Sequence, residues 1–128
     1  MTVVLVAEDD VDIRKLIAMA LRLQQMEVVE AFDGQDALDK TIQENPDIVL
    51  LDITMPHLNG FEVCEKIRQT PSIKQTPVIF ISAKIEQSEL ATSRSLGVDT
   101  VIEKPFDFLY LISKINELVN TNGAGSVL

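Results

Sequence analysis

Short apolar runs alternate with segments of helical periodicity along the chain. We predict strands at residues 3–7, 26–31, 48–51, 78–81 and 100–102, and most of these runs are continuously apolar. Continuous apolar runs of this length are typical of strands buried on both faces of a parallel sheet. Between the runs, apolar residues recur every three or four positions, as they do in amphipathic helices.

Residues that begin and end helices agree with this division. Asp10 is placed to cap the first helical segment. Asp33 opens the second segment, and Asn45, followed by a proline, closes it. Gly97 ends the fourth segment. The apolar positions that define the faces of the first and third helices are Ile13, Leu16, Ile17, Ala20 and Leu23, and Phe61, Cys64 and Ile67.

Alternating strands and helices predict an α/β fold, a doubly wound (βα)5 sandwich of three layers around a five-stranded parallel sheet. In such sheets, binding sites form beyond the carboxyl ends of the strands. Glu8 and Asp9 follow the first strand, and Asp52 ends the third. Ser82 ends the fourth strand and Lys104 follows the fifth, so we expect these side chains to converge on one crevice.

Composition is that of one ordinary globular domain. The chain has 128 residues, of which 46% are hydrophobic and 24% charged. We assign residues 1–121 to the domain and residues 122–128, small and polar, to a flexible tail. Neither an apolar run of about 20 residues nor a signal-peptide pattern is present, so we expect a cytoplasmic protein that does not enter the membrane. A single cysteine agrees with a reducing compartment.

The net charge of −9 argues against direct binding of nucleic acid, which requires clustered Lys and Arg. The clustering of the acids is more informative. Carboxylates about 5 Å apart repel by a few kcal/mol per pair at an effective dielectric constant near 20, so such a cluster needs a cation. Lys104 neutralises part of the charge, and oxygen ligands suit Mg²⁺. The alternative is that Glu8, Asp9 and Asp10 only cap a helix. That alternative does not account for Asp52, which ends a central strand.

Four ordered segments carry a family resemblance: "VLVAEDD", "VLLDITMPHLNG", "VIFISA" and "LGVDTVIEKPF". Over residues 2–120 the sequence resembles the receiver domain of two-component response regulators. The resemblance implies a flavodoxin-like sheet with strand order 2-1-3-4-5. It also implies a phosphorelay switch, a phosphoprotein carrying an aspartyl phosphate, whose phosphoryl donor is a phosphohistidine of a sensor histidine kinase or a histidine phosphotransfer protein.

The resemblance implies a role for each residue at the strand ends. Asp52 is the expected phosphoacceptor. Glu8 and Asp9 are expected to hold Mg²⁺ together with Asp52 and the backbone carbonyl of Thr54. Asp10 is left with the capping role.

Ser82 and Lys104 are expected to contact the phosphoryl oxygens, since phosphoryl transfer depends on positioning and charge neutralisation. The family implies a cis Lys104–Pro105 bond; the alternative is an ordinary trans proline that starts the last helix. Val101 departs from the family, which often has an aromatic switch residue at this position.

Output is expected through the surface of the fourth helix, fifth strand and fifth helix. The fourth helix, within "EQSELATSRSLG", has few large apolar residues and is expected to be loosely anchored. Phe108, Leu109 and Tyr110 give the fifth helix more apolar surface than one buried stripe needs. This surface is either a wide core face or a docking surface for a downstream protein or a second copy of the chain.

Two other functions are compatible with parts of the same residue set. A hydrolase of the haloacid-dehalogenase type requires a second Asp where this chain has Thr54, so we expect no turnover of external substrates. A pseudo-receiver that only binds proteins is the remaining alternative, but the acids, the acceptor and the lysine are all present. We interpret His57 as a surface-loop residue rather than a metal ligand or phosphodonor, and Cys64 as a buried, inert thiol.

Overall fold

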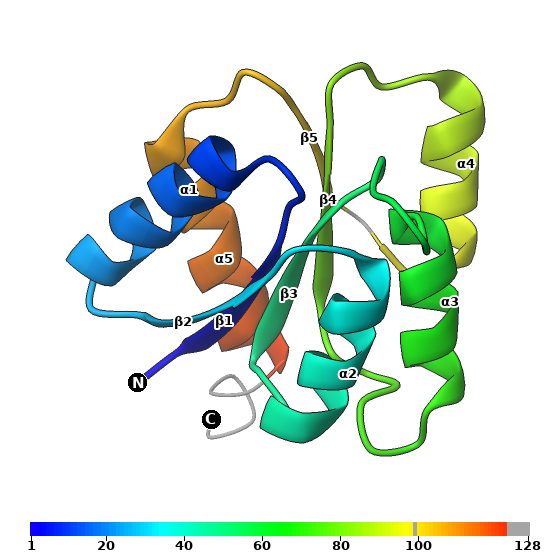
Figure 1. Cartoon of the computed structure of the whole chain (residues 1–128), viewed down its shortest axis with the longest axis horizontal. Coiled ribbons are helices and arrows are strands. Elements are labelled where there is room, and N and C mark those ends of the chain that lie inside the picture. Colours follow the sequence, from blue (N-terminus) through cyan, green and yellow to red (C-terminus); the bar gives the residue numbers. More distant parts are fainter. Residues whose placement is uncertain (99, 123–128) are drawn as a thin grey trace.

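A computed structural model describes the backbone of residues 1–98 and 100–122 and the side chains of residues 1–98 and 100–120. Strands and helices alternate along the whole described chain (Figure 1). The elements are β1 (Val3–Ala7), α1 (Val11–Leu23), β2 (Glu27–Ala31), α2 (Gly34–Glu44), β3 (Ile48–Asp52), α3 (Gly60–Gln69), β4 (Val78–Ser82), α4 (Gln87–Ser95), β5 (Thr100–Glu103) and α5 (Phe108–Asn122). Of the predicted tail, residues 123–128 lie outside the described part of the chain, and Asn122 ends α5.

The sheet is parallel throughout, with the strand order β2-β1-β3-β4-β5. The predicted fold class and strand order are therefore confirmed. β3, β4 and β5 each extend one residue beyond the predicted strand, to Asp52, Ser82 and Glu103. All residues of β3 and β4 are buried, which explains why these strands read as unbroken apolar runs.

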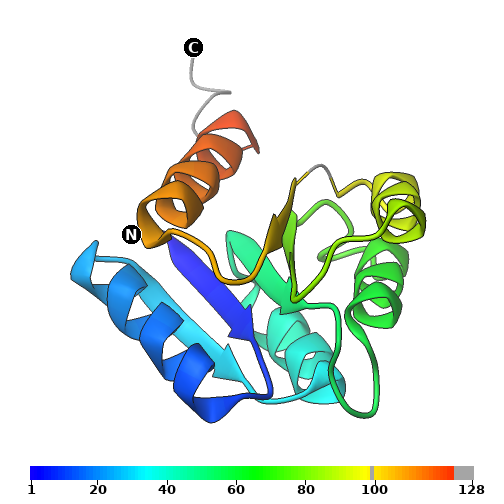
Figure 2. The ribbon, with the colours of Figure 1, turned by 90° about the horizontal axis from the view of Figure 1, so that it is seen from above.

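Helices cover both faces of the sheet, in three layers (Figure 2). α1 and α5 pack on one face, against a core that includes Val6, Ile81 and Leu111. α2, α3 and the end of α4 lie over the other face, whose core includes Leu51 and Phe80. The strands supply side chains alternately to the two cores, because successive residues of a strand point to opposite faces.

The predicted helix ends are present. The Asp10 carboxylate accepts hydrogen bonds from the N–H groups of Asp12 and Ile13 and so caps α1. Asn45 ends α2 with φ 47°, and Gly97 follows α4 with φ +76°. Asn59 opens α3 through a capping box, which the sequence analysis did not identify.

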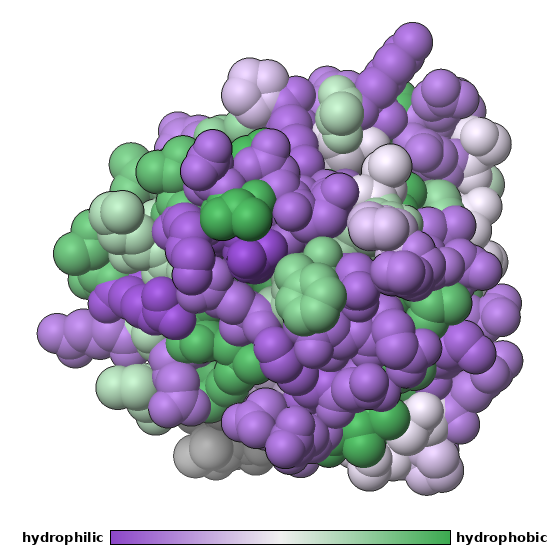
Figure 3. Space-filling model, in the orientation of Figure 1, coloured by the Kyte–Doolittle hydropathy of each residue, from purple (hydrophilic) through white to green (hydrophobic). Residues whose placement is uncertain are grey.

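The predicted face of α1 is partly wrong. Ile17 is buried as predicted, but Leu16 and Leu23 are 53% and 76% exposed. The other buried residues of α1, Ala18 and Leu21, were not among the predicted positions. Leu16, Met19 and Leu23 form an exposed apolar stripe, and hydrophobic residues gather on this side of the molecule (Figure 3). The helix therefore carries apolar residues on a face wider than the sheet can cover. None of the described helices is both long and apolar enough to cross a membrane.

Candidate functional site

The carboxyl ends of four neighbouring strands bring the predicted site residues together. Glu8 directly follows β1 and Asp52 is the last residue of β3. Ser82 is the last residue of β4, and Lys104 directly follows β5. β1, β3, β4 and β5 are adjacent in the sheet, so the four positions share one edge of the fold (Figure 1).

Three carboxylates form a compact acidic cluster at this edge. One oxygen each from Glu8, Asp9 and Asp52 lies within 4.8 Å of the others. Glu8 and Asp52 are buried, at 1% and 5% exposure, whereas Asp9 is exposed. Asp10 does not join the cluster, because its side chain caps α1.

Lys104 lies between the two buried acids. Its Nζ is 2.7 Å from Glu8 Oε1 and 2.9 Å from Asp52 Oδ2. Its backbone N–H donates to the Ser82 carbonyl oxygen at 2.7 Å, which fixes the start of the following loop. The Lys104–Pro105 peptide bond is cis, in agreement with the expectation.

The electrostatics of the cluster follow from its burial. Burial raises the pKa of Glu8 to about 7; the hydrogen bond and charge of Asp52 act in the same direction, while the bond from Lys104 opposes them. Burial alone would lower the pKa of Lys104, but the hydrogen bonds that it donates to Glu8 and Asp52 raise it. The lysine thus stays charged, and its single charge does not balance three carboxylates.

The donor set fits a hard divalent cation. All three cluster residues offer carboxylate oxygens, one of them exposed, and Mg²⁺ prefers oxygen ligands together with several waters. Thr54 also lies at the site, since its N–H donates to Asp52 Oδ1 at 3.0 Å. The part of its backbone carbonyl in metal binding stays a prediction.

Ser82 has a local partner that the sequence analysis did not identify. Its hydroxyl donates to the Lys84 carbonyl oxygen at 2.8 Å and accepts from the Lys84 N–H at 3.2 Å. The hydroxyl is therefore engaged by its own loop rather than by the acidic cluster. Val101, at the predicted switch position, packs against the core on the α3 side of the sheet.

Comparison with known proteins identifies the family. Residues 4–116 match the family model described as the response regulator receiver domain. The chain belongs to this family. It is 35% identical over 119 residues to the response regulator ArlR of Staphylococcus aureus. The aligned region covers 93% of this chain and 53% of that protein. This receiver thus spans about half the length of the curated relatives it matches.

Solved structures give the same result. The receiver domain of the Francisella response regulator 1452 superposes with a TM-score of 0.88 at 30% identity, covering 95% of this chain and 99% of that one. The Vibrio cholerae chemotaxis protein CheY4 superposes with a TM-score of 0.87 at 26% identity, covering 92% and 98%. The predicted family is confirmed. The chain is a receiver domain of a response regulator in two-component signalling, and receiver domains are signalling modules rather than substrate-turnover enzymes.

Two further residues lie where the sequence analysis placed them. His57 is in the β3–α3 loop of the receiver with φ 70°, and its side chain is 69% exposed. Its Nε2 is 3.7 Å from Asp33 Oδ2, on the β2–α2 side. Cys64 is buried in α3, and burial raises the pKa of its thiol to about 11. A thiol with this pKa is almost entirely protonated at neutral pH and therefore a poor nucleophile.

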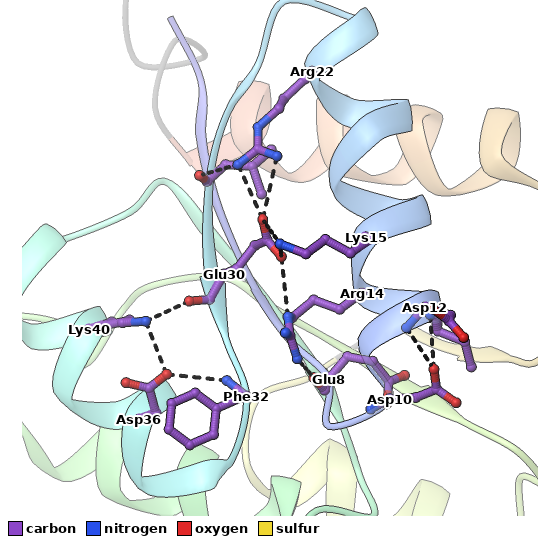
Figure 4. Close-up of polar contacts among 12 residues, drawn as sticks. Glu8, Asp10, Asp12, Arg14, Lys15, Arg22, Glu30, Phe32, Asp36 and Lys40 are labelled. Atoms are coloured by element: carbon purple, nitrogen blue, oxygen red, sulfur yellow. Dashed lines mark hydrogen bonds and ion pairs between the residues drawn. The ribbon is translucent and has the colours of Figure 1, made fainter.

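The sequence analysis missed the residues that hold the β1–α1 loop of the receiver. Arg14, in the first turns of α1, donates from Nη1 to the Glu8 backbone carbonyl oxygen at 2.8 Å (Figure 4). Its Nε also lies 3.2 Å from Glu30 Oε1 in β2. A basic residue on a helix gives no sequence signal of such a contact, because most arginines on helices face solvent.

Proposed function

We propose that this receiver is a phosphorylation-dependent switch that accepts a phosphoryl group on Asp52. One observation carries the proposal: a buried carboxylate at the end of a central strand lies against Lys104 and within 4.8 Å of two further acids. The donor is a phosphohistidine of a sensor histidine kinase or a histidine phosphotransfer protein. Response regulators as a class receive phosphoryl groups from histidine kinases.

In the transfer, a carboxylate oxygen of Asp52 attacks phosphorus and the P–N bond to the donor imidazole breaks, its electron pair remaining on nitrogen. Glu8, Asp9, Asp52 and the carbonyl of Thr54 are the proposed ligands of Mg²⁺. The bound ion supplies positive charge against the phosphoryl oxygens. Lys104, already 2.9 Å from Asp52 Oδ2, contributes a second positive charge.

Ser82 and Lys104 link the phosphoryl group to the output surface. A phosphoryl group adds about −1.5 to −2 charge and three strong acceptors. The Ser82 hydroxyl can reach such an acceptor by leaving the Lys84 carbonyl, which alters the β4–α4 loop. Lys104 begins the short loop, residues 104–107, that connects β5 to α5, so its movement is passed to that helix. These changes shift the population of conformers on the α4-β5-α5 surface.

The α4-β5-α5 surface is proposed to bind a downstream protein or a second copy of the chain. Leu109 and Tyr110, at the start of α5, are 73% and 50% exposed, in support of this role. Light scattering with Mg²⁺ and beryllofluoride, a phosphoryl mimic, tests self-association. An unchanged monomer would eliminate the second copy and leave other proteins as partners.

Incubation with acetyl phosphate and Mg²⁺, followed by intact-mass measurement, tests the phosphoacceptor. The wild type should gain the mass of one phosphoryl group, and the adduct should be lost at alkaline pH. Asp52→Asn should gain none. A stable adduct in both proteins would contradict the assignment of Asp52, and no adduct in either would favour a receiver that acts only by binding proteins.

A further inference from the structure

We propose that Arg14 is a positioning residue for the acidic site, holding the backbone of Glu8 so that Glu8 and Asp9 face Asp52, and that Glu30 in turn orients Arg14. The inference rests on the proposed function, because it concerns the binding of Mg²⁺ at that site. Neither Arg14 nor Glu30 belongs to the acidic cluster itself.

Arg14 makes two directed contacts from one guanidinium group. Nη1 donates to the Glu8 carbonyl oxygen at 2.8 Å, and Nε donates to Glu30 Oε1 at 3.2 Å. The side chain is only 12% exposed, so water competes little with these bonds. Because the guanidinium is planar and its donors are fixed relative to one another, the position of Glu30 determines where Nη1 points (Figure 4).

The Glu8 backbone is held from two directions. Its N–H donates to the Ala31 carbonyl oxygen in β2 at 3.1 Å, and its carbonyl oxygen accepts from Arg14. The Glu8 side chain also accepts from the Asp10 N–H at 3.2 Å. Asp9 lies between these two residues and its own side chain is exposed. The direction of the Asp9 carboxylate therefore depends on how firmly its neighbours are held.

Glu30 is itself fixed by more than one cation. Lys15 Nζ and Arg22 Nη2 lie 3.2 Å and 3.4 Å from its carboxylate. Burial acts to raise the pKa of Glu30, but the hydrogen bonds from Lys15 and Arg14 and the charge of Arg22 outweigh it, so the pKa is lowered. Glu30 thus remains a carboxylate at neutral pH, and Arg14 keeps its orienting partner.

Positioning and simple charge predict opposite effects on the affinity for Mg²⁺. A positive charge near the site repels a divalent cation, so removal of that charge alone should tighten binding. Loss of the Glu8 contact should weaken binding, as removal of outer-shell partners of metal ligands does by about 10–100-fold. Arg22 provides a matched control, because it binds the same Glu30 carboxylate without a hydrogen bond to Glu8. Its side chain is 51% exposed, and Arg14 and Lys15 still hold Glu30 when Arg22 is replaced.

Calorimetric titration with Mg²⁺ alone, well below the melting temperature of each protein, tests the proposal. Arg14→Gln should raise the Kd about 10-fold, whereas Arg22→Gln should leave it unchanged or lower it. Arg14→Lys keeps the positive charge but cannot contact the Glu8 carbonyl oxygen and Glu30 at the same time. This variant should therefore also bind Mg²⁺ more weakly than the wild type. Glu30→Ala should raise the Kd for Mg²⁺ by less than Arg14→Gln does.

Amide hydrogen exchange of the metal-free proteins gives a second readout. The Asp10 N–H, bonded to Glu8 Oε2, should exchange about 10-fold faster in Arg14→Gln than in Arg22→Gln. If wild type and Arg14→Gln bind Mg²⁺ equally, the inference is overturned while the proposed function stands. If the wild type does not bind Mg²⁺, the proposed metal site fails and the inference fails with it.

Discussion

α3 and α4 lie on the same side of the sheet, yet they are attached to it very differently. α3 buries Gly60, Val63, Cys64 and Ile67, and its start lies against the strand that ends in Asp52. All nine residues of α4 are described, and only Ser93 is buried. Apolar burial is the main source of helix attachment in a folded domain. α3 is therefore part of the rigid frame of the site, and α4 is the element that can move at low cost.

The few attachments of α4 lie at its ends. Arg68 of α3 donates from Nε to the Leu96 carbonyl oxygen at 2.9 Å, just beyond the end of α4. Before its start, the Ile85 N–H donates to Glu103 Oε2 at 3.1 Å. These are polar bonds at or near the surface, whose net contributions to stability are modest. Within the body of the helix, Ser93 is the one buried residue.

Truncation of one apolar side chain in α3 and one in α4 is the strongest test of how differently the two helices are attached. Ile67→Ala should lower the free energy of unfolding by about 2–5 kcal/mol, because Ile67 is fully buried and leaves a cavity. Leu90→Ala in α4 should cost less than about 1 kcal/mol, because this residue is only half-buried. Urea denaturation measures both. Equal losses would show that α4 is held as firmly as α3.

The pH dependence of stability tests whether the acidic cluster, at the end of the strands that α3 packs against, carries unbalanced negative charge. The folded-state pKa of Glu8 is raised from 4.5 to about 7, so the folded state binds a proton that the unfolded state releases at lower pH. Without divalent cations, stability should therefore fall as pH rises from about 4.5 to 7, by about 3 kcal/mol at most. Urea denaturation in the presence of a chelator measures the slope.

Two controls accompany this pH series. Glu8→Gln should abolish its share of the slope, since the amide does not titrate. Mg²⁺ in the millimolar range should restore stability at pH 7 in the wild type, because it binds the ionised cluster of the folded state. A pH profile indifferent to both the substitution and the metal would contradict the assigned electrostatics.

Release of the end of α4 should give a smaller effect. Arg68→Ala removes donors to the carbonyl oxygens of Leu96, Lys74 and Thr76 and should cost about 1–3 kcal/mol. Amide exchange should accelerate in α4 more than in α1. Lys66→Ala is a control on the same helix, because its side chain is exposed. Uniform acceleration in both helices would mean that Arg68 supports the whole domain rather than α4.

The smallest effect is expected on the proposed output surface. Leu109→Ser should change stability by less than about 0.5 kcal/mol, because Leu109 is 73% exposed. If α5 binds a second copy of the chain, the same substitution should weaken association in the presence of Mg²⁺ and beryllofluoride. Asn116→Ser, about two turns further along the same face of α5, provides a comparison with an exposed polar starting residue. Equal association of both variants and the wild type would exclude Leu109 from the interface.

The strands, and the edge of the sheet where the acidic cluster lies, were predictable from burial and topology. Strands buried on both faces are continuously apolar, so β3 and β4 were located to within a residue. Parallel topology then placed Glu8, Asp52 and Lys104 together without any knowledge of their side chains. The weak attachment expected for α4 also agrees with its single buried residue.

The errors and omissions concern side-chain direction. Leu16 and Leu23 fit a helical period equally well in the core and on the surface, so periodicity placed them wrongly. The contacts of Arg14 depend on how far a long side chain reaches across to β2, which spacing along the sequence does not encode. The Ser82 hydroxyl turns to its own loop through two local hydrogen bonds with the Lys84 backbone, which the sequence does not signal.

Gly60 determines how a loss of signalling should be interpreted. A methyl group on its Cα would lie 2.8 Å from both the Asp52 carbonyl oxygen and the Ile53 Cα, closer than real side chains approach backbone. Any larger residue must force α3 and the end of β3, which carries the proposed phosphoacceptor, apart. A signalling-defective variant at this position, recovered in a genetic screen, would therefore report displacement of the proposed nucleophile, Asp52, rather than a broken contact with a kinase.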